Sequence, residues 1–228
     1  MSKRLAIILA AGKGTRMKSD LPKVLCPVRG RPMVEYVVET LRGAGVDHLL
    51  AVVGFRADLV REALGKYPDV EFVEQTEQLG TGHAVKMCRP QLARHAGPVV
   101  IVAGDSPLTQ PESVTALFQA FETHQAACVL GTLHKDDPAG LGRIVRDDRG
   151  GFAAIVEDKD ATSAQRAITE VNMSTYVFDA AQLVRALDAL QNTNRQHEYY
   201  VTDCPGILKG WGQTVLALPV LKPCEALR

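Results

Sequence analysis

The sequence predicts an α/β fold, with a doubly wound, mostly parallel mixed sheet and helices on both faces. Short, nearly continuous apolar runs are typical of strands that are buried on both faces, and here they alternate with segments of helical period. This alternation favours parallel strands joined by helical crossovers. After His134 strands follow one another with little helix between them, which predicts a mixed sheet in the second part.

The first part of the chain has the clearest patterns. Val34, Val37, Val38 and Leu41 share one helical face, and the glycine at position 43 is of the type that ends a helix. A proline at position 111 suits the first turn of another helix. The expected strands are residues 4–10, 48–53, 70–73, 98–103 and 127–133, and the expected helices are 33–42, 57–64, 82–88 and 111–124. The glycine-rich residues 11–22 are expected to form a loop.

The second part has weaker patterns. We expect strands at 143–146, 152–156, 175–178 and 214–218, and helices at 180–190 and 201–209. The stretch from Asp147 to Gly151 is typical of a hairpin turn. We find no internal repeat and no low-complexity linker. We therefore expect one domain over residues 1–228, with one half up to about residue 133 and a second from about residue 134.

Composition narrows the class of protein. Lys plus Arg and Asp plus Glu both number 26, a balance that favours neither nucleic acid nor an anionic membrane as a partner. The five cysteines are far apart and show no C-x-x-C spacing, which argues against a disulfide framework or a zinc site and for a reducing compartment. No apolar run approaches the roughly 18 residues of a membrane span. A soluble, cytoplasmic protein is expected.

A glycine-rich basic loop follows the first expected strand. It lacks the G-x-x-x-x-G-K-[ST] pattern of a Walker A loop, and Met17 stands at the third glycine position of a dinucleotide fingerprint. Glycines at the carboxyl edge of a parallel sheet let the backbone approach a phosphate closely, and Arg16 and Lys23 add positive charge. The alternative is a tight turn with solvated basic residues.

Two later loops carry polar groups after expected strands. The segment 75–84 (QTEQLGTGHA) offers side-chain amides, which both donate and accept hydrogen bonds, as the imide edge of uracil requires. A plain polar loop is the alternative, and we expect His83 to be structural. Asp105 ends the strand at 98–103, so its carboxylate is expected in the same crevice, where Mg²⁺ takes one or two carboxylates with phosphate oxygens and water. A turn cap is the alternative reading of Asp105.

These motifs resemble those of sugar-1-phosphate nucleotidyltransferases. The string L-A-A-G-x-G-T-R-M followed by L-P-K resembles their signature, and residues 75–84 are similar to the uridyl-recognition segment of the bacterial bifunctional UDP-N-acetylglucosamine pyrophosphorylase and glucosamine-1-phosphate acetyltransferase. Further matches lie at residues 140–144, 155–162, 170–172 and 198–203. The resemblance covers nearly all of the chain and implies a Rossmann-like nucleotidyltransferase fold.

The resemblance also implies a role for each matching residue. It assigns Arg16 and Lys23 to the triphosphate as catalytic residues, and Asp105 to Mg²⁺. Tyr199 and Tyr200 are expected to pack and to order a helix start. The implied nucleotide-binding residues are Leu9, Ala10, Ala11, Gly12, Gly14, Gln75, Gln78, Gly80 and Thr81, and the implied sugar-binding residues are Gly140, Glu157 and Asn172.

The chain departs from the family pattern in three places. Met173 and Ser174 stand where the family usually has Thr-Gly, and Ala103 stands where it often has Tyr. The V-N-[TN]-R stretch, whose Asn is the family's second protein ligand of the metal, would fall just after Arg228. We find no hexapeptide repeats of a left-handed β-helix acetyltransferase domain.

The expected reaction joins UTP and N-acetylglucosamine 1-phosphate. It gives UDP-N-acetylglucosamine and pyrophosphate through Mg²⁺-dependent, in-line attack on the α-phosphate. The expected partners are these small molecules alone, without nucleic acid or membrane, and a monomer or weak dimer is expected. Two alternatives stay open. One is a related transferase for another nucleoside triphosphate or sugar 1-phosphate, and the other is a non-catalytic regulatory domain that binds a nucleotide sugar.

Overall fold

The computed structural model describes residues 3–14 and 20–226. The strands are β1 (Leu5–Ala10), β2 (Pro27–Val28), β3 (Arg31–Pro32), β4 (His48–Val53), β5 (Val70–Glu74), β6 (Pro98–Ala103), β7 (Cys128–His134), β8 (Arg143–Arg146), β9 (Phe152–Val156), β10 (Glu170–Asp179) and β11 (Val215–Leu218). The α-helices are α1 (Met33–Gly43), α2 (Ala57–Leu64), α3 (Thr81–Met87), α4 (Arg89–Leu92), α5 (Pro111–His124), α6 (Ser163–Arg166), α7 (Ala180–Ala189) and α8 (Asp203–Gly210). Two 3-10 helices are η2 (Lys23–Leu25) and η3 (Pro223–Ala226).

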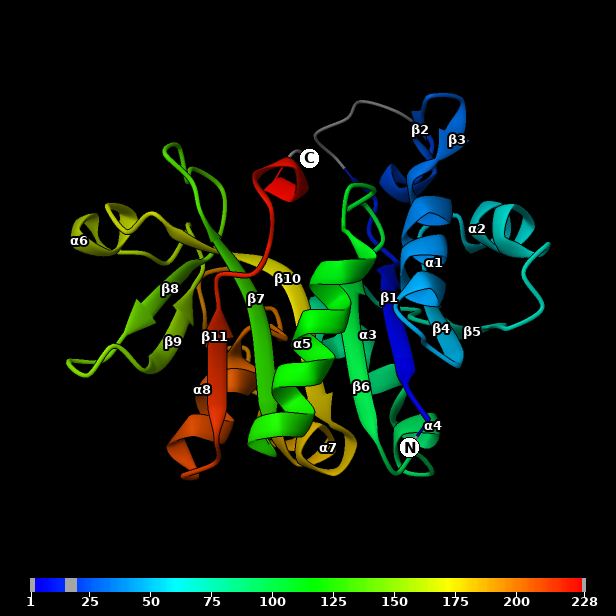
Figure 1. Ribbon diagram of the computed structural model, residues 1–228. Coiled ribbons are helices and arrows are strands. Elements are labelled where there is room, and N and C mark those ends of the chain that lie inside the picture. Colours follow the sequence, from blue (N-terminus) through cyan, green and yellow to red (C-terminus); the bar gives the residue numbers. More distant parts are fainter. Residues whose placement is uncertain (1–2, 15–19, 227–228) are drawn as a thin grey trace.

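Within the described residues, nine strands form one mixed sheet. Its main path runs β11-β7-β10-β6-β1-β4-β5, across the width of the molecule in Figure 1. β1 pairs in parallel with both β4 and β6, and β4 pairs in parallel with β5. Parallel neighbours require crossovers, which the helices between these strands supply. The α/β class and the mostly parallel mixed sheet expected from the sequence are confirmed.

Strand β10 breaks the parallel order. It lies between β6 and β7 and runs antiparallel to both, while β11 pairs in parallel with β7. The β8–β9 hairpin joins the sheet through β10 and extends to one side of it in Figure 1. Because β10 comes from the second half of the chain and its two neighbours from the first, the halves expected from the sequence share one sheet.

Both faces of the sheet are covered, which explains the continuous apolar runs. Along β1, Leu5 and Ile7 pack with α3, α4, α7 and α8 in one cluster of buried residues. Ala6 and Ile8 point the other way, into a second cluster with α1, α2 and α5. Strand side chains alternate between faces, so every position of such a strand is apolar. In Figure 1, α1 and α5 cross in front of the sheet.

Element boundaries agree closely with expectation where the hydrophobic period is clear, as in β4, α2, β6 and α5. The hairpin turn expected after Arg146 is also confirmed, since β8 and β9 pair antiparallel across it. The strand expected at 175–178 was too short, because β10 begins at Glu170 and passes through an irregularity between Asn172 and Tyr176. No helix in the described part of the chain is long and apolar enough to cross a membrane.

Candidate active site

The carboxyl ends of β1, β5 and β6 lie at one edge of the sheet, and a cleft of about 420 Å³ opens there. Ligands of open α/β sheets bind at this edge. The cleft is lined by Leu9, Ala11, Gly12, Gly14, Lys23, Val24, Gln75, Gln78, Gly80, Thr81, Ala84, Ala103, Asp105, Glu157, Ser174, Tyr176, Glu198, Val201 and Thr202. The structure thus brings together most of the residues singled out in the sequence.

The loop after β1 forms one wall of the cleft. Gly14 has φ +65°, and a Cβ there would lie 2.6 Å from the Cβ of Lys23, so both backbone conformation and packing require glycine. Ala10 does not line the cleft, because its side chain belongs to the core on the α1 face of the sheet. Arg16, the other cation expected here, lies outside the described residues.

Lys23 and Asp105 form an ion pair at the edge of the sheet. Lys23 Nζ donates to Asp105 Oδ2 over 2.5 Å, and both side chains retain access to solvent. Asp105 follows β6, and the neighbouring Gly104 N–H donates to the Leu9 carbonyl over 2.9 Å, which holds the two loops together. The cleft therefore presents a cation and a carboxylate side by side, as a polyphosphate with a divalent cation would require.

Gln75 is held in one orientation beside the cleft. Its side chain is only 3% exposed, and its Nε2 donates to the Gly80 carbonyl over 3.1 Å and lies 3.0 Å from His83 Nδ1. Gln78 Nε2 donates to the Gln75 backbone carbonyl over 3.3 Å. With Nδ1 as the unprotonated nitrogen, His83 accepts from the amide and fixes its flip state. This contact supports the structural role expected for His83.

A segment distant in sequence shapes the loop before α3. The Gly82 N–H donates to the Tyr199 carbonyl over 2.7 Å, and the Tyr199 N–H donates to the Leu79 carbonyl over 2.8 Å. The Val201 N–H donates to Thr81 Oγ1 over 3.1 Å. Gly80 has φ +105°, and a Cβ there would lie 2.5 Å from the Tyr199 carbonyl oxygen. Glycine is thus required for residues 198–201 to lie against this loop.

The expected sugar-binding residues are divided by the structure. Glu157, after β9, lines the cleft and accepts a 3.0 Å hydrogen bond from Thr202 Oγ1. Asn172 is only 4% exposed and does not line the cleft. Its Nδ2 donates to the Tyr176 hydroxyl over 2.7 Å. Gly140 is an exposed loop residue outside the lining, although the Asn172 N–H donates to the carbonyl of nearby Gly142 over 2.8 Å.

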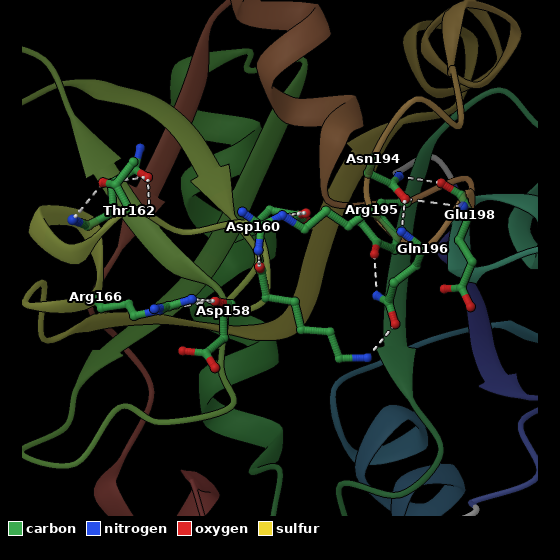
Figure 2. A network of polar contacts seen from close by, with 11 residues as sticks. Asp158, Asp160, Thr162, Arg166, Asn194, Arg195, Gln196 and Glu198 are labelled. Atoms are coloured by element: carbon green, nitrogen blue, oxygen red, sulfur yellow. Dashed lines mark hydrogen bonds and ion pairs between the residues drawn. The ribbon is translucent and has the colours of Figure 1, made fainter.

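Beside the cleft lies a second hollow of about 590 Å³, which shares Glu157 with it and contains Asp160 and Asp203. Burial, together with the smaller effect of the charges of Glu157 and Asp160, raises the pKa of Asp203 to about 6. The loops 158–162 and 194–198 meet nearby. Figure 2 shows the polar network that joins them, in which Arg195 Nη1 donates to the Lys159 carbonyl over 3.0 Å.

Sequence reasoning missed several cleft residues. Ser174 and Tyr176 lie in the irregular part of β10, and Glu198, Val201 and Thr202 lie in the segment that packs on α3. Both groups reach the cleft through long-range pairing, which leaves no periodic signal in the sequence. Residues 198–203 match the family in sequence, and this match is the signal that could have placed Glu198, Val201 and Thr202 at the site.

The arrangement can bind an elongated, anionic ligand. A cation and a carboxylate lie at the edge of the sheet, fixed amides and glycine backbone lie on the α3 side, and a carboxylate–hydroxyl pair lies on the β9 side. Within residues 3–14 and 20–226, no group of three or more His, Cys, Asp or Glu side chains is placed to hold a metal. A metal in this cleft would therefore share its coordination with the ligand's phosphates.

Comparison with curated proteins finds relatives that match nearly all of this chain. The chain is 47% identical over 214 residues to the bifunctional protein GlmU of Exiguobacterium sp., and 46% identical over 227 residues to that of Brevibacillus brevis. These matches cover 94% and 100% of this chain, and 47% and 49% of those proteins, so the chain spans about half the length of these curated relatives.

A solved structure shares the fold. UDP-glucose pyrophosphorylase, complexed with UDP-glucose, superposes with a TM-score of 0.81 at 17% sequence identity, over 99% of this chain and 94% of that one. The sequence model of the MobA-like NTP transferase domain matches residues 6–200, which include every strand of the main sheet except β11 and the first residue of β1. The chain therefore belongs to the MobA-like NTP transferase domain family.

Proposed function

We propose that this chain is a uridylyltransferase that joins UTP to N-acetylglucosamine 1-phosphate and releases pyrophosphate. The observation that carries the proposal is the single cleft that unites Lys23 and Asp105, the fixed amide of Gln75, and the Glu157–Thr202 pair. The nucleotide half of the cleft lies over β1 and β5, and the sugar half lies over β9 and β10. The 46–47% identity to GlmU proteins supports this assignment.

The reaction needs no covalent enzyme intermediate. A sugar phosphate has a second pKa near 6 and is largely dianionic at pH 7, so its oxygen is already a nucleophile. It attacks the α-phosphorus of UTP, the new P–O bond forms, and the bond to the β-phosphate breaks with pyrophosphate as the leaving group. Catalysis then consists of positioning and charge stabilisation. In this proposal Lys23, which lines the cleft, stabilises the negative charge on the triphosphate.

A divalent cation fits the residues that are present. Asp105 offers one partly exposed carboxylate at the cleft edge, and Mg²⁺ commonly takes one or two carboxylates plus phosphate oxygens. We propose Mg²⁺ as the ion, held by Asp105 and the triphosphate. When bound, it would neutralise phosphate charge. Lys23, now paired with Asp105, would turn its ammonium toward the phosphates.

The α3 side of the cleft fits uracil. Gln75 and Gln78 place amide groups beside the glycine backbone at Gly80, and amides complement the donor and acceptor groups of the uracil edge. We assign the base to this wall and the ribose to the wall formed by Leu9, Ala11 and Gly12. The roles of Arg16, Gly140 and Asn172 remain those that the family resemblance implies.

We propose that residues 1–228 act as one nucleotidyltransferase domain, with the nucleotide bound mainly by the first half and the sugar mainly by the second. Its partners in this proposal are the small-molecule substrates. All five cysteines are free thiols, which fits a reducing compartment such as the cytoplasm.

The test is pyrophosphate release from UTP and N-acetylglucosamine 1-phosphate with Mg²⁺. Parallel reactions use glucose 1-phosphate in place of the acetylated sugar, and ATP, CTP, GTP or dTTP in place of UTP. Release restricted to UTP and the acetylated sugar is the expected result. Release with a different pair would assign the chain to a related transferase. UTP binding in calorimetry without release from any pair would refute catalysis and indicate a nucleotide-binding domain.

A further inference from the structure

Ser174 occupies an unusual backbone position in the wall of the cleft. It lies in the irregular part of β10, has φ +55°, and is half-buried. Non-glycine residues rarely adopt this left-handed region, and such strain gathers at ligand sites. Four other non-glycine residues in the described ranges have positive φ, and they do not line the cleft; they are Arg29, Arg56, Gln125 and His197.

Asn172 holds Ser174 in this conformation. Asn172 Oδ1 accepts a hydrogen bond from the Ser174 N–H over 3.2 Å, while Asn172 Nδ2 donates to the Tyr176 hydroxyl over 2.7 Å. Both ends of the buried amide are therefore engaged within β10. Ser174 and Tyr176 line the cleft, whereas Asn172 does not.

The position of Ser174 places it near the reacting groups. Thr175 pairs with Val102, so Ser174 lies beside the end of β6, close to Ala103 and to the loop that carries Asp105. Glu157 lines the same cleft. Within residues 3–14 and 20–226, the Ser174 hydroxyl has no hydrogen-bond partner in the protein, so it is available to a ligand.

We propose that Ser174 is a specificity-determining residue whose hydroxyl hydrogen-bonds an uncharged group of the sugar in the sugar 1-phosphate. The inference rests on the proposed uridylyltransferase function. Glycine would adopt φ +55° without strain, but it would leave no hydroxyl and a wider wall at this point. Serine therefore adds one polar contact and one side chain's volume on the sugar side of the cleft.

The test compares wild-type protein with Ser174→Ala and Ser174→Gly in steady-state pyrophosphate release. Loss of one neutral hydrogen bond is expected to raise KM for N-acetylglucosamine 1-phosphate about five-fold in both variants, with KM for UTP unchanged. Ser174→Gly should also reduce selectivity, measured as the ratio of kcat/KM for N-acetylglucosamine 1-phosphate to kcat/KM for glucose 1-phosphate or galactose 1-phosphate. Gln125→Gly is the matched control, because it relieves a similar φ of +47° at the end of α5, outside the cleft.

The outcomes separate this inference from the proposed function. If the wild type is active and both Ser174 variants show wild-type KM values with every sugar phosphate, the inference is overturned and the function stands. If the wild type releases no pyrophosphate, the function fails, and calorimetry with UDP-N-acetylglucosamine then tests the contact directly. Equal affinity of wild type and Ser174→Ala for that nucleotide sugar would overturn the inference in that case too.

Discussion

Replacing Gly80 by alanine should separate the loop before α3 from the segment that carries Tyr199. Gly80 has φ +105° and ψ 175°, a region open essentially to glycine alone. A Cβ there would lie 2.5 Å from the Tyr199 carbonyl oxygen and 2.9 Å from the Glu198 Cβ. The same Tyr199 carbonyl oxygen accepts the hydrogen bond from the Gly82 N–H. Moving this oxygen away from the new Cβ should therefore break that hydrogen bond.

The size of the effect follows from two contributions. The backbone conformation costs about 1–3 kcal/mol for a residue other than glycine, and overpacking against fixed atoms costs about 1–3 kcal/mol more. We expect a loss of about 4 kcal/mol in the free energy of unfolding if these contributions are roughly additive. For a domain of this size each kcal/mol lowers Tm by about 2–4 °C, so the expected drop is about 8–16 °C.

Thermal unfolding followed by circular dichroism measures the drop, and calorimetry measures UTP binding. Gly206→Ala in α8 is the matched control, because a Cβ there meets no atom within 4 Å. It should stabilise the protein by about 0.5–1 kcal/mol, as alanine does in a helix interior. The Gly80 variant should also bind UTP more weakly, because Gln75 donates to the Gly80 carbonyl. A Gly80→Ala protein with wild-type Tm and UTP affinity would refute the reasoning.

Three further predictions concern charged groups. Asp105→Asn should reduce pyrophosphate release at least about 100-fold. It should not alter Tm by more than about 3 °C, because an ion pair that keeps access to solvent, as Lys23–Asp105 does, contributes about 0–1 kcal/mol. Activity and melting measured on the same sample check both. The folded-state pKa of Asp203 is raised from 3.8 to about 6, so stability should fall as pH rises from about 4 to about 6. Asp203→Asn should remove this fall and, after allowance for solvent screening, stabilise the protein by about 1 kcal/mol at pH 7; urea unfolding across this pH range is the measurement. Burial alone would raise the pKa of Glu170, but hydrogen bonds from Arg146 and Thr132 outweigh it and lower the pKa. Stability from Glu170 is then present above its ordinary pKa of 4.5 and lost as pH falls below it, and Glu170→Gln should cost about 3 kcal/mol at pH 7; unchanged urea unfolding of the variant would contradict this.

Most helices and strands could be predicted because local sequence determines them. β4 and β6 are buried on both faces, so each strand is a nearly unbroken apolar run, and the strand begins and ends close to where the run does. The first part of β10 was missed because Glu170 and Asn172 are polar. Both are buried in the structure, where hydrogen bonds to Arg146 and Tyr176 satisfy their side chains. The insertion of β10 between β6 and β7 could not be predicted, because strand order depends on pairing between distant residues rather than on local period.

The site was predictable where its residues follow parallel strands. Gly14, Gln75 and Asp105 all lie in the loops that follow such strands, and the topology brings these loops to one edge. The sugar side was less predictable. The contact expected between Asn172 and the ligand stays a prediction, and the hydrogen bonds that its amide makes within β10 could not be read from local sequence. Thr202 was missed as a cleft residue because its hydrogen bond to Glu157 joins segments far apart in the chain.

The position of β10 has a consequence for the order of folding. β6 and β7 are made before β10 emerges from the ribosome, yet neither can pair on its inner side until β10 fills the gap. During that interval both strands expose unpaired backbone edges beside their apolar side chains, and such edges are sites for aggregation and mispairing. A fragment that stops after β7 would keep those edges permanently. The native sheet can therefore form only late in synthesis, when β10 pairs with β6 and β7. The same pairing completes the wall of the cleft that contains Ser174 and Tyr176.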